Sequence, residues 1–176
     1  VGPSSPGHFR YPLKDFTRQD GGLCSAQYRC TWDPTVPFSW QDNAKMGATQ
    51  VLYFTSVYHD HLEAAPIGFT RAAGNFETRD GDQVEVNDLD GANTDNGFPD
   101  LAHVDNANMS TPPDGTPPTM QMYLQPIPND PTDPYIPSDT GSEASSVYHE
   151  YTHGLSNRLV IDADGVSTLN GPQSGA

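Results

Sequence analysis

Residues 149–153 have the pattern H-E-x-x-H, and this short segment constrains the fold of the chain more than any other feature. The surrounding residues 144–159 have the pattern of a helix, which Ser142 or a neighbouring residue can cap. On a helix, residues four positions apart lie one above the other on the same face. His149 and His153 can therefore share one tetrahedral metal ion.

The pattern also places a carboxylate beside that metal. Glu150 lies about 100° round the helix from His149, where it can reach a metal-bound water without being a ligand. Zinc lowers the pKa of such a water toward about 7, and the carboxylate takes its proton as the water attacks a carbonyl carbon. Glu150 then returns the proton to the leaving amine. The alternative interpretation is a pair of partly buried, hydrogen-bonded histidines beside a surface glutamate.

Composition limits the partners of the protein. The 176 residues include 8 Lys and Arg against 23 Asp and Glu, a net charge of −15. Nucleic acid is not expected as a partner, because phosphate backbones are bound by cationic surfaces. No apolar run approaches the roughly 20 residues of a membrane span, so no membrane partner is expected. The first six residues lack the features of an export signal, and we expect any such signal to have been removed.

The chain is predicted to have an α+β fold with long loops. Residues 1–42 are rich in proline, glycine and aromatic residues, and they predict an extended arm that drapes over a domain formed by residues 43–176. A helix is expected over residues 43–65, ended by Pro66. Alternation in residues 83–86 and 120–124 predicts strands of a small, twisted, mostly antiparallel sheet. The second helix is the one that carries the H-E-x-x-H pattern.

Two cysteines and a cluster of acids raise separate questions. Cys24 and Cys30 predict a local disulfide in an oxidising compartment, with a pair of free thiols as the alternative. Nine acidic residues lie between Glu77 and Asp105, against one base, Arg79. Such a stretch can bind a structural calcium ion through six to eight oxygens, or it can be a solvated acidic surface.

The residues from His149 to Leu159 resemble the zinc helix of the fungalysin family of secreted metalloendopeptidases, which have a thermolysin-like catalytic fold. Segments 58–62, 73–76, 106–116 and 120–124 share the resemblance, which spans about residues 48–172. It implies that residues 43–176 form the N-terminal lobe of an extracellular, zinc-dependent endopeptidase acting on polypeptides. In this family His149 and His153 would hold the zinc ion, with Glu150 as the general base.

The resemblance also implies where the rest of the site lies. The third zinc ligand would be a glutamate on a later helix, beyond Ala176, after a loop similar to residues 171–176. A C-terminal lobe or second fragment would supply it, and residues 1–176 alone would be inactive. Asn106 and Ala107 would form the edge of the cleft, where a substrate adds as an extra strand; the alternative is an ordinary turn and strand.

A second function from a different class remains open at this point. The chain can also be interpreted as a non-catalytic extracellular module for calcium binding or adhesion, in which the H-E-x-x-H pattern is vestigial. Stoichiometric zinc and peptide cleavage distinguish the two hypotheses.

Overall fold

The computed structural model describes residues 1–16 and 24–169, and it confirms the α+β class. Within these ranges, two α-helices and five short strands are joined by loops and short 3-10 turns. The helices are α1 (Ala44–Glu63) and α2 (Ala144–Leu159). The strands are β1 (Glu85–Asp88), β2 (Ala107–Ser110), β3 (Thr119–Met122), β4 (Leu124–Gln125) and β5 (Ser138–Asp139). The 3-10 turns are η1 (Ser39–Asn43), η2 (Arg71–Ala73), η3 (Thr78–Asp80) and η4 (Thr140–Ser142).

Both helices form where the sequence predicts them. Helix α1 buries Val51 and Leu62 on one face and ends at Glu63, before Pro66. Helix α2 covers the expected range, but the predicted side-chain cap by Ser142 or a neighbouring residue is not formed. Glu143 occupies the N-cap position without a capping side-chain bond, and the Ser142 hydroxyl donates to Asp139 Oδ2 instead, at 3.4 Å.

The main sheet has three strands in the order β1-β3-β2, with β3 in the centre. Strand β2 pairs antiparallel with β3 through the connection 111–118, and Ala107 lies opposite Met122. Strand β1 pairs parallel with β3, and a separate antiparallel pair joins β4 to β5. The main sheet is therefore mixed, the smaller one is antiparallel, and β2 is an edge strand of the main sheet among the residues described.

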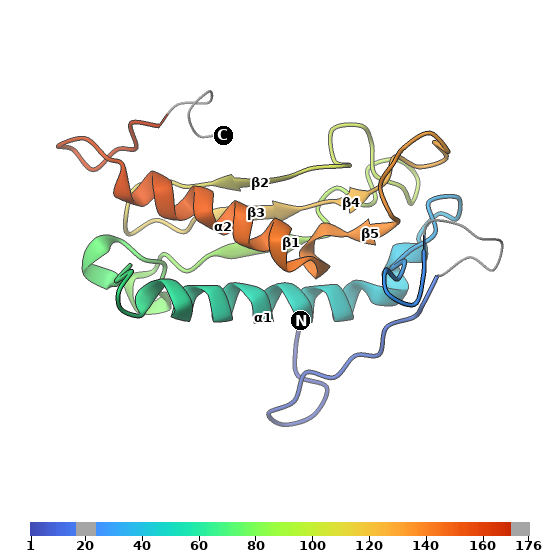
Figure 1. The fold of residues 1–176 in the computed structure, drawn as a ribbon, viewed down its shortest axis with the longest axis horizontal. Helices are drawn as coiled ribbons and strands as arrows, with labels where there is room; N and C mark the ends of the chain where they lie inside the picture. Colours follow the sequence, from blue (N-terminus) through green and yellow to red (C-terminus); the bar gives the residue numbers. More distant parts are fainter. Residues whose placement is uncertain (17–23, 170–176) are drawn as a thin grey trace.

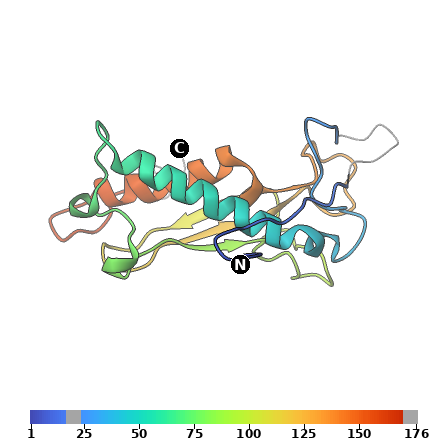
Figure 2. The same ribbon diagram turned by 90° about the horizontal axis from the view of Figure 1, so that it is seen from below.

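The two helices lie side by side on one face of the sheet (Figures 1 and 2). Helix α1 contacts β1, whereas α2 contacts β2 and β3. The core between these layers consists of residues contributed by both helices, by β3 and by the segment after α1, and they are Val51, Leu62, Phe69, Phe76, Met120, Met122, Val147 and Tyr151. Burial of this face holds α2, and with it the H-E-x-x-H pattern, against the sheet.

The N-terminal segment is attached to the rest through aromatic side chains. Trp32 is 1 % exposed and donates from Nε1 to the carbonyl of Gln125 at 2.7 Å. Trp40 donates in the same way to the carbonyl of Gly97 at 2.9 Å.

The two α-helices of the described residues, α1 and α2, are not long and apolar enough to cross a membrane.

Candidate metal centre and cleft

Helix α2 brings His149 and His153 together. Their Nε2 atoms lie 3.0 Å apart, with the ring planes at 87°. Two nitrogen ligands about 2.0–2.1 Å from one tetrahedral zinc ion would be about 3.3 Å apart, so the observed pair fits a shared zinc. Burial, together with the charge of His149, lowers the pKa of His153. This shift favours the neutral ring that binds a metal.

Glu150 completes the group on the same helix. One donor atom from each of His149, Glu150 and His153 lies within 4.8 Å of the others. Within residues 1–16 and 24–169, this is the group of His, Cys, Asp and Glu side chains that converges closely enough to hold a metal ion. Glu150 is 6 % exposed, and burial raises the pKa of its carboxyl, an effect that His149 partly offsets.

A cleft of about 890 Å³ lies beside this group. Helix α2 contributes His149 and Glu150 to its lining; Asn106, directly before β2, and Ala107, the first residue of β2, line it as well. The structure therefore brings Asn106 and Ala107, which the resemblance assigns to substrate, to the same cleft as His149, one member of the proposed metal pair (His149 and His153). Because β2 is an edge strand, its outward N–H and C=O groups can pair with an extended peptide.

The sequence patterns did not predict two kinds of cleft residue, one apolar and one acidic. Tyr28, from the segment between the two cysteines, and Tyr135 and Ile136, from the proline-rich segment before β5, add an apolar part of the lining. Asp105 and Glu143 add carboxyl groups; burial, together with a hydrogen bond to Asp133 and its charge, raises the pKa of Asp105 to about 7. No local pattern marks these residues, because they meet only when distant segments pack together.

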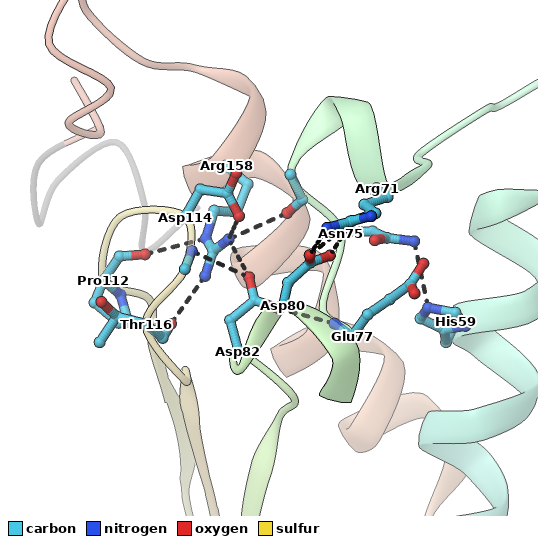
Figure 3. A network of polar contacts seen from close by, with 12 residues as sticks. His59, Arg71, Asn75, Glu77, Asp80, Asp82, Pro112, Asp114, Thr116 and Arg158 are labelled. Carbon is cyan, nitrogen blue, oxygen red and sulfur yellow. Dashed lines mark hydrogen bonds and ion pairs between the residues drawn. The ribbon is translucent and has the colours of Figure 1, made fainter.

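The C-terminal end of α2 is held by a buried ion-pair network (Figure 3). The Arg158 side chain is 3 % exposed, and its Nη1 lies 2.9 Å from both Asp82 Oδ2 and Asp114 Oδ1. Its other nitrogens donate to the carbonyls of Pro112 and Thr116, at 3.0 Å each. The residue stands five positions beyond His153, so it anchors the helix that carries the metal pair.

The disulfide prediction is confirmed, because Cys24 and Cys30 are bonded, with Cα atoms 5.5 Å apart.

The acidic residues between Glu77 and Asp105 do not share one common partner, because several of them pair with different side chains of the protein. Asp80 pairs with Arg71, and Asp100 pairs with His103. Calcium binding by these acids stays a prediction. The loop 171–176, which the resemblance places before the third zinc ligand, lies outside the described residues.

The α+β layers, the edge strand and the converging His149, Glu150 and His153 on α2 are consistent with the N-terminal lobe of a thermolysin-like metallopeptidase. The chain belongs to the fungalysin metallopeptidase family (M36), whose model matches residues 13–176. The resemblance predicted from the motifs is therefore confirmed.

Curated relatives agree with this assignment. Extracellular metalloproteinase 10 of Coccidioides posadasii (strain C735) is 42 % identical over 156 residues, which cover 85 % of this chain and 22 % of that protein. Extracellular metalloproteinase 4 of Arthroderma otae is 38 % identical over 166 residues, or 94 % of this chain and 23 % of the relative. Extracellular metalloproteinase 3 of Trichophyton soudanense is 39 % identical over 155 residues, 82 % of this chain and 34 % of the relative. The chain thus spans between about a fifth and a third of these relatives.

Proposed function

We propose that this chain is the metal-binding lobe of a secreted, zinc-dependent endopeptidase that hydrolyses internal peptide bonds in proteins. One observation carries the proposal: His149, Glu150 and His153 converge within 4.8 Å, and His149 and Glu150 line a cleft that also includes Ala107 of edge strand β2. The names of the relatives, which are extracellular metalloproteinases, support both the activity and the location.

The residues of α2 have distinct roles in this reaction. His149 and His153 hold the zinc ion through their Nε2 atoms. When bound, zinc supplies Lewis-acid polarisation of the scissile carbonyl and of the attacking water. The carboxylate of Glu150 accepts the proton of that water and donates it to the nitrogen of the leaving amine. Its carboxylate lies within the same 4.8 Å group, close enough to reach a water held there.

Strand β2 orients the substrate. An extended polypeptide adds to the free edge at Asn106 and Ala107, and backbone hydrogen bonds align its scissile bond with Glu150. This mode of binding recognises the backbone, so it suits cleavage within many different sequences. Tyr28, Tyr135 and Ile136, in the same cleft, supply apolar contacts for a substrate side chain.

A third protein ligand is needed to complete a catalytic zinc site. The described residues contribute the two histidines and Glu150 to the converging group. We therefore propose that a glutamate from sequence outside residues 1–176, in a C-terminal lobe or second fragment, completes the site. Residues 1–176 alone are then expected to cleave no casein-like substrate, and chelator-sensitive cleavage by this chain alone would contradict the proposal.

The test of the mechanism is Glu150→Gln in the full-length protein. The variant keeps the size of the side chain but cannot accept the proton, so peptide cleavage should fall by at least about 100-fold while bound zinc stays stoichiometric. Glu85→Gln, the same change at an exposed position on β1, is the matched control and should leave cleavage unchanged. Full activity of Glu150→Gln would sink the general-base assignment.

Metal content separates the proposal from the alternative, a non-catalytic calcium-binding or adhesion module. Elemental analysis of the purified full-length protein should find one zinc per chain, reduced in His149→Ala and His153→Ala. Absence of stoichiometric zinc, with calcium in its place, would favour the alternative.

A further inference from the structure

Arg158 makes more contacts than an anchor for one helix needs. All three of its side-chain nitrogens are hydrogen-bonded, and Nη1 also lies 3.3 Å from the carbonyl of Gly74. Its guanidinium stands 4.9 Å from the centre of the Phe76 ring. The planar fork of an arginine can bond several acceptors in fixed directions at once, which a lysine ammonium cannot do.

The partners of Arg158 belong to two separate segments (Figure 3). Pro112, Asp114 and Thr116 lie in the connection 111–118, which joins β2 to β3. Gly74 and Asp82 lie in the segment between α1 and β1. Arg158 therefore ties the connection that follows β2 to the C-terminal end of α2.

A second contact between α2 and β2 lies one turn earlier in the helix. A Cβ atom at Gly154 would stand 2.8 Å from Met109 Cε and 2.9 Å from Phe76 Cζ, so a larger residue here would require these side chains to shift. Met109 is in the middle of β2, and the start of the same strand lines the cleft with His149 and Glu150. Helix α2 thus packs against β2 itself at Gly154, and Arg158 binds the connection that follows β2. The cleft lies toward the opposite ends of both elements, at the start of β2 and in the first half of α2.

We propose that Arg158 is a positioning residue that sets the register of edge strand β2 against helix α2, and so aligns a β2-bound peptide with Glu150 and the metal pair. This inference rests on the proposed function. Because the metal pair is fixed to α2 and the peptide to β2, a small slide between the two elements misplaces the scissile bond without disturbing either group. Cleavage of peptides that pair along more of β2 should depend more on this register than cleavage of minimal peptides.

The test compares Arg158→Lys with the unmodified full-length protein on two peptides that share a scissile bond, one minimal and one extended toward the side that pairs with β2. We expect kcat/KM to fall about tenfold more for the extended peptide than for the minimal one. Hydrogen exchange, followed by mass spectrometry, should be faster in residues 106–112 of the variant and unchanged in α1. Asp114→Ala, which removes one bond from an exposed loop residue, should give the same pattern more weakly and serves if Arg158→Lys folds poorly.

Arg71→Lys is the matched control. Arg71 also pairs with an aspartate, Asp80, but it is exposed and its bonds lie within the segment 71–80. The ratio between the two peptides should not change in this variant. Equal losses on both peptides in Arg158→Lys would show a purely structural role and overturn the positioning role. If the unmodified protein cleaves no peptide, the proposed function fails. Unchanged hydrogen exchange in residues 106–112 of Arg158→Lys would separately contradict the inference that Arg158 sets the register of β2.

Discussion

Asp82 and Asp88 come from the same acidic stretch, yet the fold places them in opposite environments. Asp82 is completely buried and accepts hydrogen bonds from Arg158, at 2.9 Å, and from the backbone of Glu77, at 3.0 Å. Burial alone would raise the pKa of Asp82, but these bonds hold it below its ordinary value. Asp88 faces another acid, Asp139, and its two oxygens are buried without a donor among the described residues.

The pair of acids therefore retains a proton. Burial and the charge of Asp139 raise the pKa of Asp88 to about 9, and burial raises the pKa of Asp139 to about 6. The same side chain is a fixed anion in one place and a proton donor in the other, because one has a cation as neighbour and the other an anion. The difference shows that counts of acidic residues do not predict local charge in this fold.

The largest effect should follow from removing the positive charge of Arg158, the partner of Asp82. Arg158→Met leaves Asp82 buried without its partner, and we expect the free energy of unfolding to fall by about 3–5 kcal/mol. Urea denaturation at pH 7 measures it. Arg158→Met combined with Asp82→Asn should recover part of the loss, and a double variant no more stable than the single one would contradict the assigned pairing.

Asp82→Asn tests the same cluster from the other partner. Loss of the charge-assisted bond should cost about 2 kcal/mol at pH 7. Since the pKa of Asp82 is lowered by folding, its contribution is present above the unfolded pKa and is lost as pH falls through the folded pKa. The variant should therefore lose less stability than the unmodified protein between pH 5 and pH 2, as followed by thermal unfolding. If the stability of the two proteins falls in parallel over this pH range, the lowered pKa of Asp82 is contradicted.

Asp88→Asn should act in the opposite direction, by stabilising the protein. The folded pKa of Asp88 is raised, so the folded state holds more protons than the unfolded state between about pH 4 and pH 9, and stability is lost as pH rises through that window. The neutral amide can still donate to Asp139, and we expect about 1–3 kcal/mol of added stability at pH 9. Asp95→Asn, at an exposed position, is the control and should leave the pH dependence unchanged.

The smallest effect concerns the glycine against which the two acids pack. A Cβ atom at Gly47 would lie 2.2 Å from Asp139 Oδ2 and 2.9 Å from Asp88 Oδ2. Alanine is favoured over glycine inside a helix by about 1 kcal/mol, but overpacking costs about 1–3 kcal/mol, so Gly47→Ala should lower stability by about 1 kcal/mol. A gain in stability, measured by calorimetry, would show that the side chains of Asp88 and Asp139 can move away from the added methyl group at little cost. Ser56→Ala, at an exposed position on α1, is the comparison.

Local patterns were sufficient to predict the helices and the close approach of His149 to His153. Helix periodicity gave both helical segments to within two residues, because the alternation of buried and exposed positions is a property of neighbouring residues. The sequence alone did not predict the parallel pairing of β1 with β3, since strand order depends on which distant segments share a core. It also missed the contributions of Tyr28 and Tyr135 to the cleft, which come from segments more than 100 residues apart.

By itself, the sequence determined the spacing that places His149, Glu150 and His153 on one helix, together with the family and the local disulfide. The spacing of the histidines and the disulfide depend on residues within six positions of one another, for which backbone geometry decides what meets. The family match, in contrast, extends over residues 13–176. The tertiary structure alone decided that Asp82 would meet Arg158 and that Asp88 would meet Asp139. The partners lie 76 and 51 residues apart, and burial of the core, rather than any local rule, brings them together.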